Sequence, residues 1–164
     1  MKQCGFSLME LMVTVAIVAI LASIAIPSYR SYIIRANRTV AKTALLEVAA
    51  KQESYFTDHK GYAVYFDRLG YGASASSAST AYVDTQGKIS LSNTGAIYTL
   101  MLTGVGTMSS CAGLSGAAGG LAFAISAAPT GTQIDAICGT ICVSQTGERG
   151  TTAGASKIAD CWGR

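Results

Sequence analysis

The sequence has little of what catalysis usually requires. Its 164 residues include one histidine, His59, and only 13% of them are charged. There is no phosphate-binding loop, no nucleophile motif and no paired carboxylates on a recognisable scaffold, and the glycines around Gly104 do not follow a dinucleotide-binding pattern. Cys138 and Cys142 have three residues between them, whereas zinc motifs commonly have two, and His59 is distant in sequence. We therefore expect no enzyme activity, no cofactor and no metal site.

An excess of charge of one sign is also missing from most of the chain. From residue 57 onward, six Lys and Arg residues face six Asp and Glu residues. The expected head domain is thus formally neutral, and its overall charge gives no reason to expect a nucleic-acid partner.

Glycine and proline are absent from residues 28–56, although the chain has 18 glycines. Apolar residues recur in this stretch at helical spacing, namely Ile34, Ala41, Leu45, Val48 and Tyr55. The pattern predicts an amphipathic helix with this stripe buried under the head domain.

What the chain does have is a long apolar run near its start. From Phe6 to Ile26 the only charged residue is Glu10. At about 1.5 Å per helical residue the run reaches roughly 30 Å, the thickness of a bilayer core, so we expect a membrane-spanning helix. Inserting a carboxylate at the bilayer centre costs on the order of 2 to 3 kcal/mol, so Glu10 should have a partner. Pro27 should bend the helix at the far interface.

The residues before this run predict a cleaved leader. Residues 1–5 are too short for an ordinary secretory signal, and the apolar run follows the small residue Gly5 instead of preceding it. Cleavage after Gly5 would create an amine on Phe6, four residues before Glu10. Lys2 would hold this end on the cytoplasmic side.

This N-terminal sequence resembles the class III signal of type IV pilins and related pseudopilins; it reads Gly5-Phe6-Ser7-Leu8-Met9-Glu10-Leu11 and continues apolar to Pro27. The resemblance implies cleavage between Gly5 and Phe6 by a prepilin peptidase, and N-methylation of Phe6. It also implies that the helices assemble into a filament core, where Glu10 neutralises the Phe6 amine of a neighbouring subunit. The expected location is the inner membrane, single-pass with a cytoplasmic N terminus, and then the pilus fibre in the periplasm and at the cell surface.

The fold implied by the resemblance is α+β, with the long N-terminal helix packed on a C-terminal antiparallel sheet. Strand-like runs separated by glycine-rich turns agree with it, at Lys88–Ser92, Ile97–Thr103, Leu121–Ala127 and Gly139–Ser144. The expected divisions are a leader (1–5), an assembly helix (6–27), an amphipathic helix (28–56), a connecting loop (57–96) and the sheet with a disulfide-bonded end (97–164).

Four cysteines would be exported, because Cys4 leaves with the leader: Cys111, Cys138, Cys142 and Cys161. An even count in an oxidising compartment indicates two disulfides, with three connectivities open. The C-terminal segment, with its Cys138-Gly-Thr run, Thr-Gly-x-basic turn and terminal Cys161-Trp162, resembles PilE-like, ComP-related minor pilins. That resemblance implies pairing of Cys138 with Cys161. We infer a second bridge between Cys111 and Cys142, which lies four positions from Cys138 and so on the same face of a strand.

The leading hypothesis is a structural minor pilin of a type IV pilus that supports pilus biogenesis, motility and adhesion. Its partners would be other pilin subunits, the prepilin peptidase, the inner-membrane assembly machinery and, before assembly, the membrane. A DNA-binding pilin for natural transformation is one alternative, with Arg149, Lys157 and Arg164 as candidate contacts. A pseudopilin of a type II secretion system is another, although the exported cysteines and the terminal Cys-Trp speak for a pilin.

Overall fold

The computed structural model describes residues 7–72, 77–104, 111–114, 122–131 and 133–163, and the chain divides into two units, Met1–Ala36 and Asn37–Arg164. Helix α1 (Leu8–His59) makes up the described part of the first unit except Ser7, and its remaining residues belong to the second. It continues through Pro27, which lies inside the helix. We refer to the second unit as the head.

The part of α1 inside the head buries one face. The buried residues are Arg38, Ala41, Ala44, Leu45, Val48 and Gln52. Three of the residues expected in the stripe are therefore buried, whereas Ile34 and Tyr55 are only partly covered. Two polar residues, Arg38 and Gln52, extend the buried face beyond the apolar pattern, because each has hydrogen-bonding partners in the head.

The helix ends at His59, three residues beyond the expected amphipathic segment 28–56. Lys60 follows the last helical residue with φ of 55°, the left-handed conformation that commonly terminates helices, and its amide donates to the Phe56 carbonyl at 2.9 Å.

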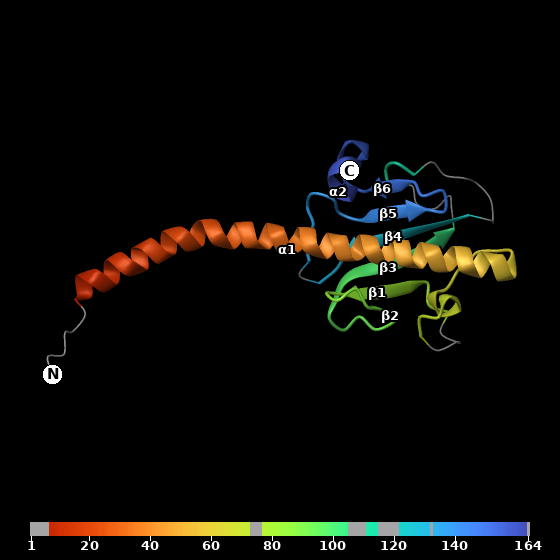
Figure 1. Ribbon diagram of the computed structural model, residues 1–164, viewed down its shortest axis with the longest axis horizontal. Helices are drawn as coiled ribbons and strands as arrows, with labels where there is room; N and C mark the ends of the chain where they lie inside the picture. Colours follow the sequence, from red (N-terminus) through yellow and green to blue (C-terminus); the bar gives the residue numbers. More distant parts are fainter. Residues whose placement is uncertain (1–6, 73–76, 105–110, 115–121, 132, 164) are drawn as a thin grey trace. The chain divides into compact units, whose positions relative to one another are not determined.

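Within the residues that the structure describes, the sheet of the head has six strands in the order β2-β1-β3-β4-β5-β6, and every neighbouring pair is antiparallel (Figure 1). In chain order the strands are β1 (Thr80–Asp84), β2 (Ile89–Ser90), β3 (Ala96–Gly104), β4 (Phe123–Pro129), β5 (Ile141–Ser144) and β6 (Arg149–Thr151). Two short 3₁₀ helices, η1 (Phe66–Leu69) and η2 (Ala155–Lys157), and helix α2 (Ile158–Trp162) complete the head.

The core lies between α1 and one face of the sheet. Alternate residues of the paired strands supply it, and the pairing places Ala81, Leu100, Ala127 and Ile141 side by side across four strands. Cys142 and Ser144 are also buried, and by strand alternation they face the opposite side of the sheet. The second face of the sheet is therefore covered at β5, whereas Met101 on the same face of β3 is 45% exposed.

The fold is the expected α+β pilin fold. In the segment 57–96, expected to be a connecting loop with a strand-like run at Lys88–Ser92, the structure adds η1 and strand β1, and the run contains β2. β1 is short and presents only Ala81 and Val83 to the core, so its apolar signal is weak.

Candidate functional site: the assembly helix and the disulfide-bonded face

The N-terminal half of α1 is the first candidate site. The helix is long and apolar enough to cross a membrane, and no residue of its most apolar 18-residue window is buried. Glu10, in the first helical turn, is exposed, and a carboxylate there is favoured by the helix dipole. The hydroxyls of Thr14 and Ser23 donate to the carbonyls of Leu11 and Ile20 at 2.8 and 2.7 Å. Glu10 is thus the one charged group on an otherwise apolar helical surface between Leu8 and Ile26.

Gly5 and Phe6, the predicted cleavage and methylation positions, lie outside the described residues. Cleavage, methylation and the pairing of Glu10 with a new amine therefore remain predictions.

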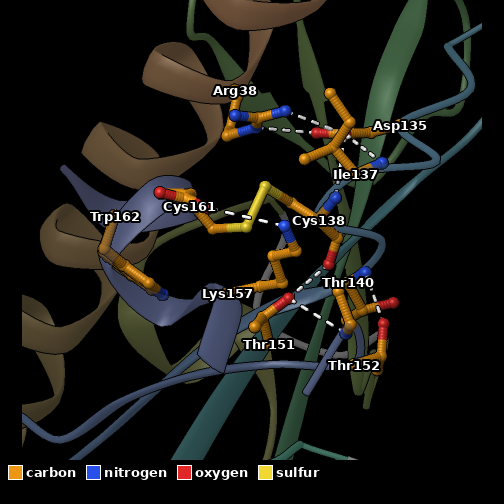
Figure 2. Close-up of a disulfide and its surroundings, with 12 residues drawn as sticks. Arg38, Asp135, Ile137, Cys138, Thr140, Thr151, Thr152, Lys157, Cys161 and Trp162 are labelled. Carbon is orange, nitrogen blue, oxygen red and sulfur yellow. Dashed lines mark hydrogen bonds and ion pairs between the residues drawn. A yellow bond between two sulfur atoms is a disulfide. The ribbon is translucent and has the colours of Figure 1, made fainter. Parts of the chain in front are cut away.

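A buried ion pair joins α1 to the loop between β4 and β5. Arg38 donates from Nε and Nη2 to the two carboxylate oxygens of Asp135 at 2.7 and 2.8 Å (Figure 2). The two side chains are only 7% and 1% exposed. Bidentate geometry of this kind is among the stronger charge-assisted interactions, and it fixes the loop to the helix.

Asp135 also organises the turn that carries Cys138. Its Oδ1 accepts the amides of Ile137 and Cys138 at 3.2 and 3.1 Å, and its carbonyl accepts the amide of Gly139 at 2.8 Å. Cys138 therefore lies in a turn before β5 rather than on the strand itself. The inference that Cys138 and Cys142 share one strand face was wrong for this reason.

The disulfide Cys138–Cys161 brings α2 to this turn, with the Cα atoms 5.6 Å apart (Figure 2). The Thr151 hydroxyl donates to the Cys138 carbonyl, and the Thr140 amide donates to the Thr152 hydroxyl at 3.0 Å. The end of the chain is thus bonded to the turn and to β6.

The disulfide Cys111–Cys142 covers the other face of the sheet, with Cα atoms 6.5 Å apart. Ala112 exchanges two backbone hydrogen bonds with Thr151, each 3.1 Å long. A Cβ on Gly150 would lie 2.8 Å from the Ala112 carbonyl oxygen, so only glycine allows this close approach. These are the two cysteine pairs expected from the sequence.

The cationic residues singled out in the sequence have different partners in the structure. Arg149 is exposed on β6, with its guanidinium 5.5 Å from the centre of the Trp162 ring. Lys157 instead pairs with Asp160 at 3.6 Å, and Arg164 lies outside the described residues.

Lys42 is the cation that sequence reasoning missed. Burial lowers the pKa of Lys42 most, and the positive charges of Arg38 and Arg149 lower it further. Lys42 on α1 is therefore within electrostatic range of Arg149 on β6. No feature of the sequence signals that positions so far apart act on each other.

The residues that could suggest chemistry have structural roles instead. His59 stacks on Tyr55, with ring centroids 4.0 Å apart and planes 4° from parallel. A surface pocket of about 480 Å³ lies beside this pair. Within the described ranges, no three His, Cys, Asp or Glu residues are grouped so that they could hold a metal ion.

An exposed apolar helix that continues into a head of antiparallel strands, closed by a C-terminal disulfide, defines the class of type IV pilins. Residues 1–26 match the prokaryotic N-terminal methylation motif. Residues 27–142 match the family described as type IV minor pilin ComP, DNA uptake sequence receptor. The chain belongs to this ComP family of type IV minor pilins.

Curated relatives match over shorter segments. The type IV major pilin protein PilA of Myxococcus xanthus is 39% identical over 67 residues, which cover 41% of this chain and 30% of PilA. The type IV major fimbrial protein FimA of Dichelobacter nodosus is 36% identical over 97 residues, which cover 52% of this chain and 58% of FimA. A fimbrial protein of Pseudomonas aeruginosa is 49% identical over 51 residues, 30% of this chain and 33% of the relative. The chain therefore spans between 30% and 58% of the length of these relatives.

Proposed function

We propose that this protein is a structural minor pilin that is built into a type IV pilus and has no catalytic role. The observation that carries the proposal is the apolar surface of α1 between Leu8 and Ile26, which stays uncovered within the chain and carries one carboxylate, Glu10. An uncovered apolar helix needs either lipid or other helices around it. A pilin uses both environments, the membrane before assembly and the filament core afterwards.

The proposed sequence of events begins with the prepilin peptidase, which removes residues 1–5 and leaves the amine of Phe6. The assembly helix, 6–27 with Pro27 at its end, then leaves the inner membrane with the help of the assembly machinery. Glu10 pairs with the Phe6 amine of an adjoining pilin subunit, which sets the axial register. The head, from the amphipathic part of α1 to the C terminus, remains outside the helical core in the periplasm and later at the cell surface.

Substitution of Glu10 tests this proposal. We expect Glu10→Val and Glu10→Lys to remain in the membrane fraction yet to be absent from sheared fibres, because the amine of a neighbour would stay unpaired in an apolar core. Thr14→Val is the matched control, since it changes a polar side chain on the same helix without removing a charge. Wild-type levels of Glu10→Val in fibres would contradict the proposed pairing.

A second candidate function is DNA capture, which the description of the family suggests and which the positive charge of Arg149 acting on Lys42 favours. Like charges repel each other, and a bound DNA phosphate would reduce that repulsion. Lys157 contributes less in this scheme, because it already pairs with Asp160.

Salt-dependent binding of duplex DNA to the mature protein in detergent tests this second function. For Lys42→Gln with Arg149→Gln we expect weaker binding, and a log–log salt slope that is smaller by about two. Lys88→Gln, an exposed cation next to β2, should leave the slope unchanged. No binding at low salt, or an unchanged slope in the double variant, would remove DNA capture at this site.

A further inference from the structure

The loop that joins β4 to β5 buries polar residues and exposes apolar ones. Gln133 and Asp135 are buried, with 7% and 4% exposure, whereas Ile134 and Ile137 are 73% and 59% exposed. Ala136 between them is exposed as well. Soluble surfaces usually show the opposite order, with isoleucine inside and carboxylates outside. We call residues 133–138 the isoleucine loop.

The isoleucine loop is held firmly from its buried side. The Asn37 side-chain amide donates to Gln133 Oε1 at 2.8 Å, Asp135 forms its bidentate pair with Arg38, and Cys138 is bonded to Cys161. Gln133 Oε1 and the Asp135 carboxylate thus have hydrogen-bonding partners inside the head. The carboxylate is the only charged group of the loop, and Arg38 neutralises it. The outward side is apolar and uncharged, and it is presented on a fixed backbone.

The two residues that hold the loop, Asn37 and Arg38, are the first two residues of the head. The loop is therefore held by the part of α1 with which the head begins. In a filament whose subunits share a core of helices, this part of the head is joined most directly to the core.

We propose that the isoleucine loop docks on the apolar half of α1 of a neighbouring pilin subunit. This inference rests on the proposed function, and it adds a contact made by the head to the contacts between helices. The helix offers a complementary surface, because Ala16, Ala19 and Ser23 follow one another at spacings of three and four on one face and are all exposed. The Ser23 hydroxyl donates its proton to the Ile20 carbonyl of the same helix, so Ser23 can pack like a small apolar residue. Large side chains pack well into such a row of small ones.

Two surfaces could cover the isoleucines, a neighbouring helix or the lipid around the protein's own anchor. A photo-crosslinking amino acid, p-benzoylphenylalanine, at position 137 of the full chain distinguishes them. In sheared filaments we expect a crosslink between pilins that maps to residues 16–23 of the second subunit. The same amino acid at Val64, which is 63% exposed elsewhere on the head, should give no crosslink to that helix segment. Crosslinks to lipid or to head residues, with none to the helix in filaments, would overturn the inference.

The double substitution Ile134→Ser with Ile137→Ser supplies the second measurement. Its content in sheared filaments should fall by about tenfold or more, because two large apolar side chains would no longer be buried against the neighbour. Val64→Ser should be incorporated like the wild type, and both variants should melt at the wild-type temperature because the changed side chains are exposed. Wild-type incorporation of the double variant would overturn the inference alone. Absence of the wild-type protein itself from filaments would instead overturn the proposed function, and this inference with it.

Discussion

The side-chain amide of Gln52 exchanges two hydrogen bonds with the backbone of Ala63. Gln52 Nε2 donates to the Ala63 carbonyl at 2.8 Å, and the Ala63 amide donates to Gln52 Oε1 at 2.9 Å. Gln52 is fully buried and Ala63 is 6% exposed, so water does not replace these bonds. This pair fastens the chain that leaves α1 back onto the helix.

Replacing Gln52 by leucine should therefore destabilise the head by about 2 to 4 kcal/mol. Leucine keeps the volume but leaves a buried amide and a buried carbonyl without partners, each at about 1 to 3 kcal/mol. Chemical denaturation of the mature protein in detergent measures the change. Gln86→Leu, at an exposed position, should change stability by no more than about 0.5 kcal/mol. A similar loss in both variants would argue against the role of the Gln52 bonds.

The two disulfides should contribute comparable stability but have different local effects. They close 23 and 31 residues, and the chain-entropy model gives roughly 3 kcal/mol for each. We expect removal of Cys138–Cys161 by a double serine substitution to release α2 and expose Trp162, the single tryptophan, which shifts its emission to longer wavelength. Removal of Cys111–Cys142 should lower stability without this shift, because Trp162 belongs to the core cluster, which does not include Cys111 or Cys142. An equal shift in both variants would contradict this arrangement.

We expect the head to become less stable at alkaline pH because of Tyr71. Its hydroxyl donates to Glu47 Oε1 at 2.8 Å, and Lys51 lies 3.7 Å above its ring. Burial, and next the hydrogen bond and charge of Glu47, raise the pKa of Tyr71 above its ordinary value of about 10. The pKa of Tyr71 is higher in the folded protein than in the unfolded chain. Its contribution to the free energy of unfolding is therefore complete below the pKa of the unfolded chain, and it is lost as the pH rises above that value.

The measurement is denaturation of the wild type and of Tyr71→Phe between neutral pH and pH about 11, just past the ordinary tyrosine pKa. Wild-type stability should fall more steeply above that pKa than the stability of the variant. A residual slope is expected in the variant, because burial also raises the pKa values of Tyr62 and Tyr98. Identical slopes would show that Tyr71 is not linked to folding in this range.

Much of the fold was predictable because its signals are local. The apolar run, the stripe through Ala41, Leu45 and Val48, and the absence of glycine and proline from residues 28–56 are contiguous patterns, and the structure has one helix through all of them. β1 was missed because two small inward residues carry little signal next to a serine-rich stretch. β6 was read as a turn, since it has three residues and includes Gly150.

The candidate sites also differ in whether a local sequence pattern reveals them. Glu10 stands out by sequence alone, because it interrupts an apolar run. The Arg38–Asp135 pair and the electrostatic effect of Arg149 on Lys42 depend on how the head part of α1 lies on the sheet, and no spacing in the sequence encodes either. The exposure of Ile134 and Ile137 was equally hidden, because isoleucine in a short segment normally indicates core.

The central claim is that proteolysis at Gly5 turns a membrane anchor into a filament subunit. Intact mass spectrometry of the chain purified from sheared filaments tests it most directly. The account predicts a chain that begins at a methylated Phe6 and lacks four hydrogens, one pair for each disulfide. A filament-derived chain that still carried residues 1–5 would contradict it.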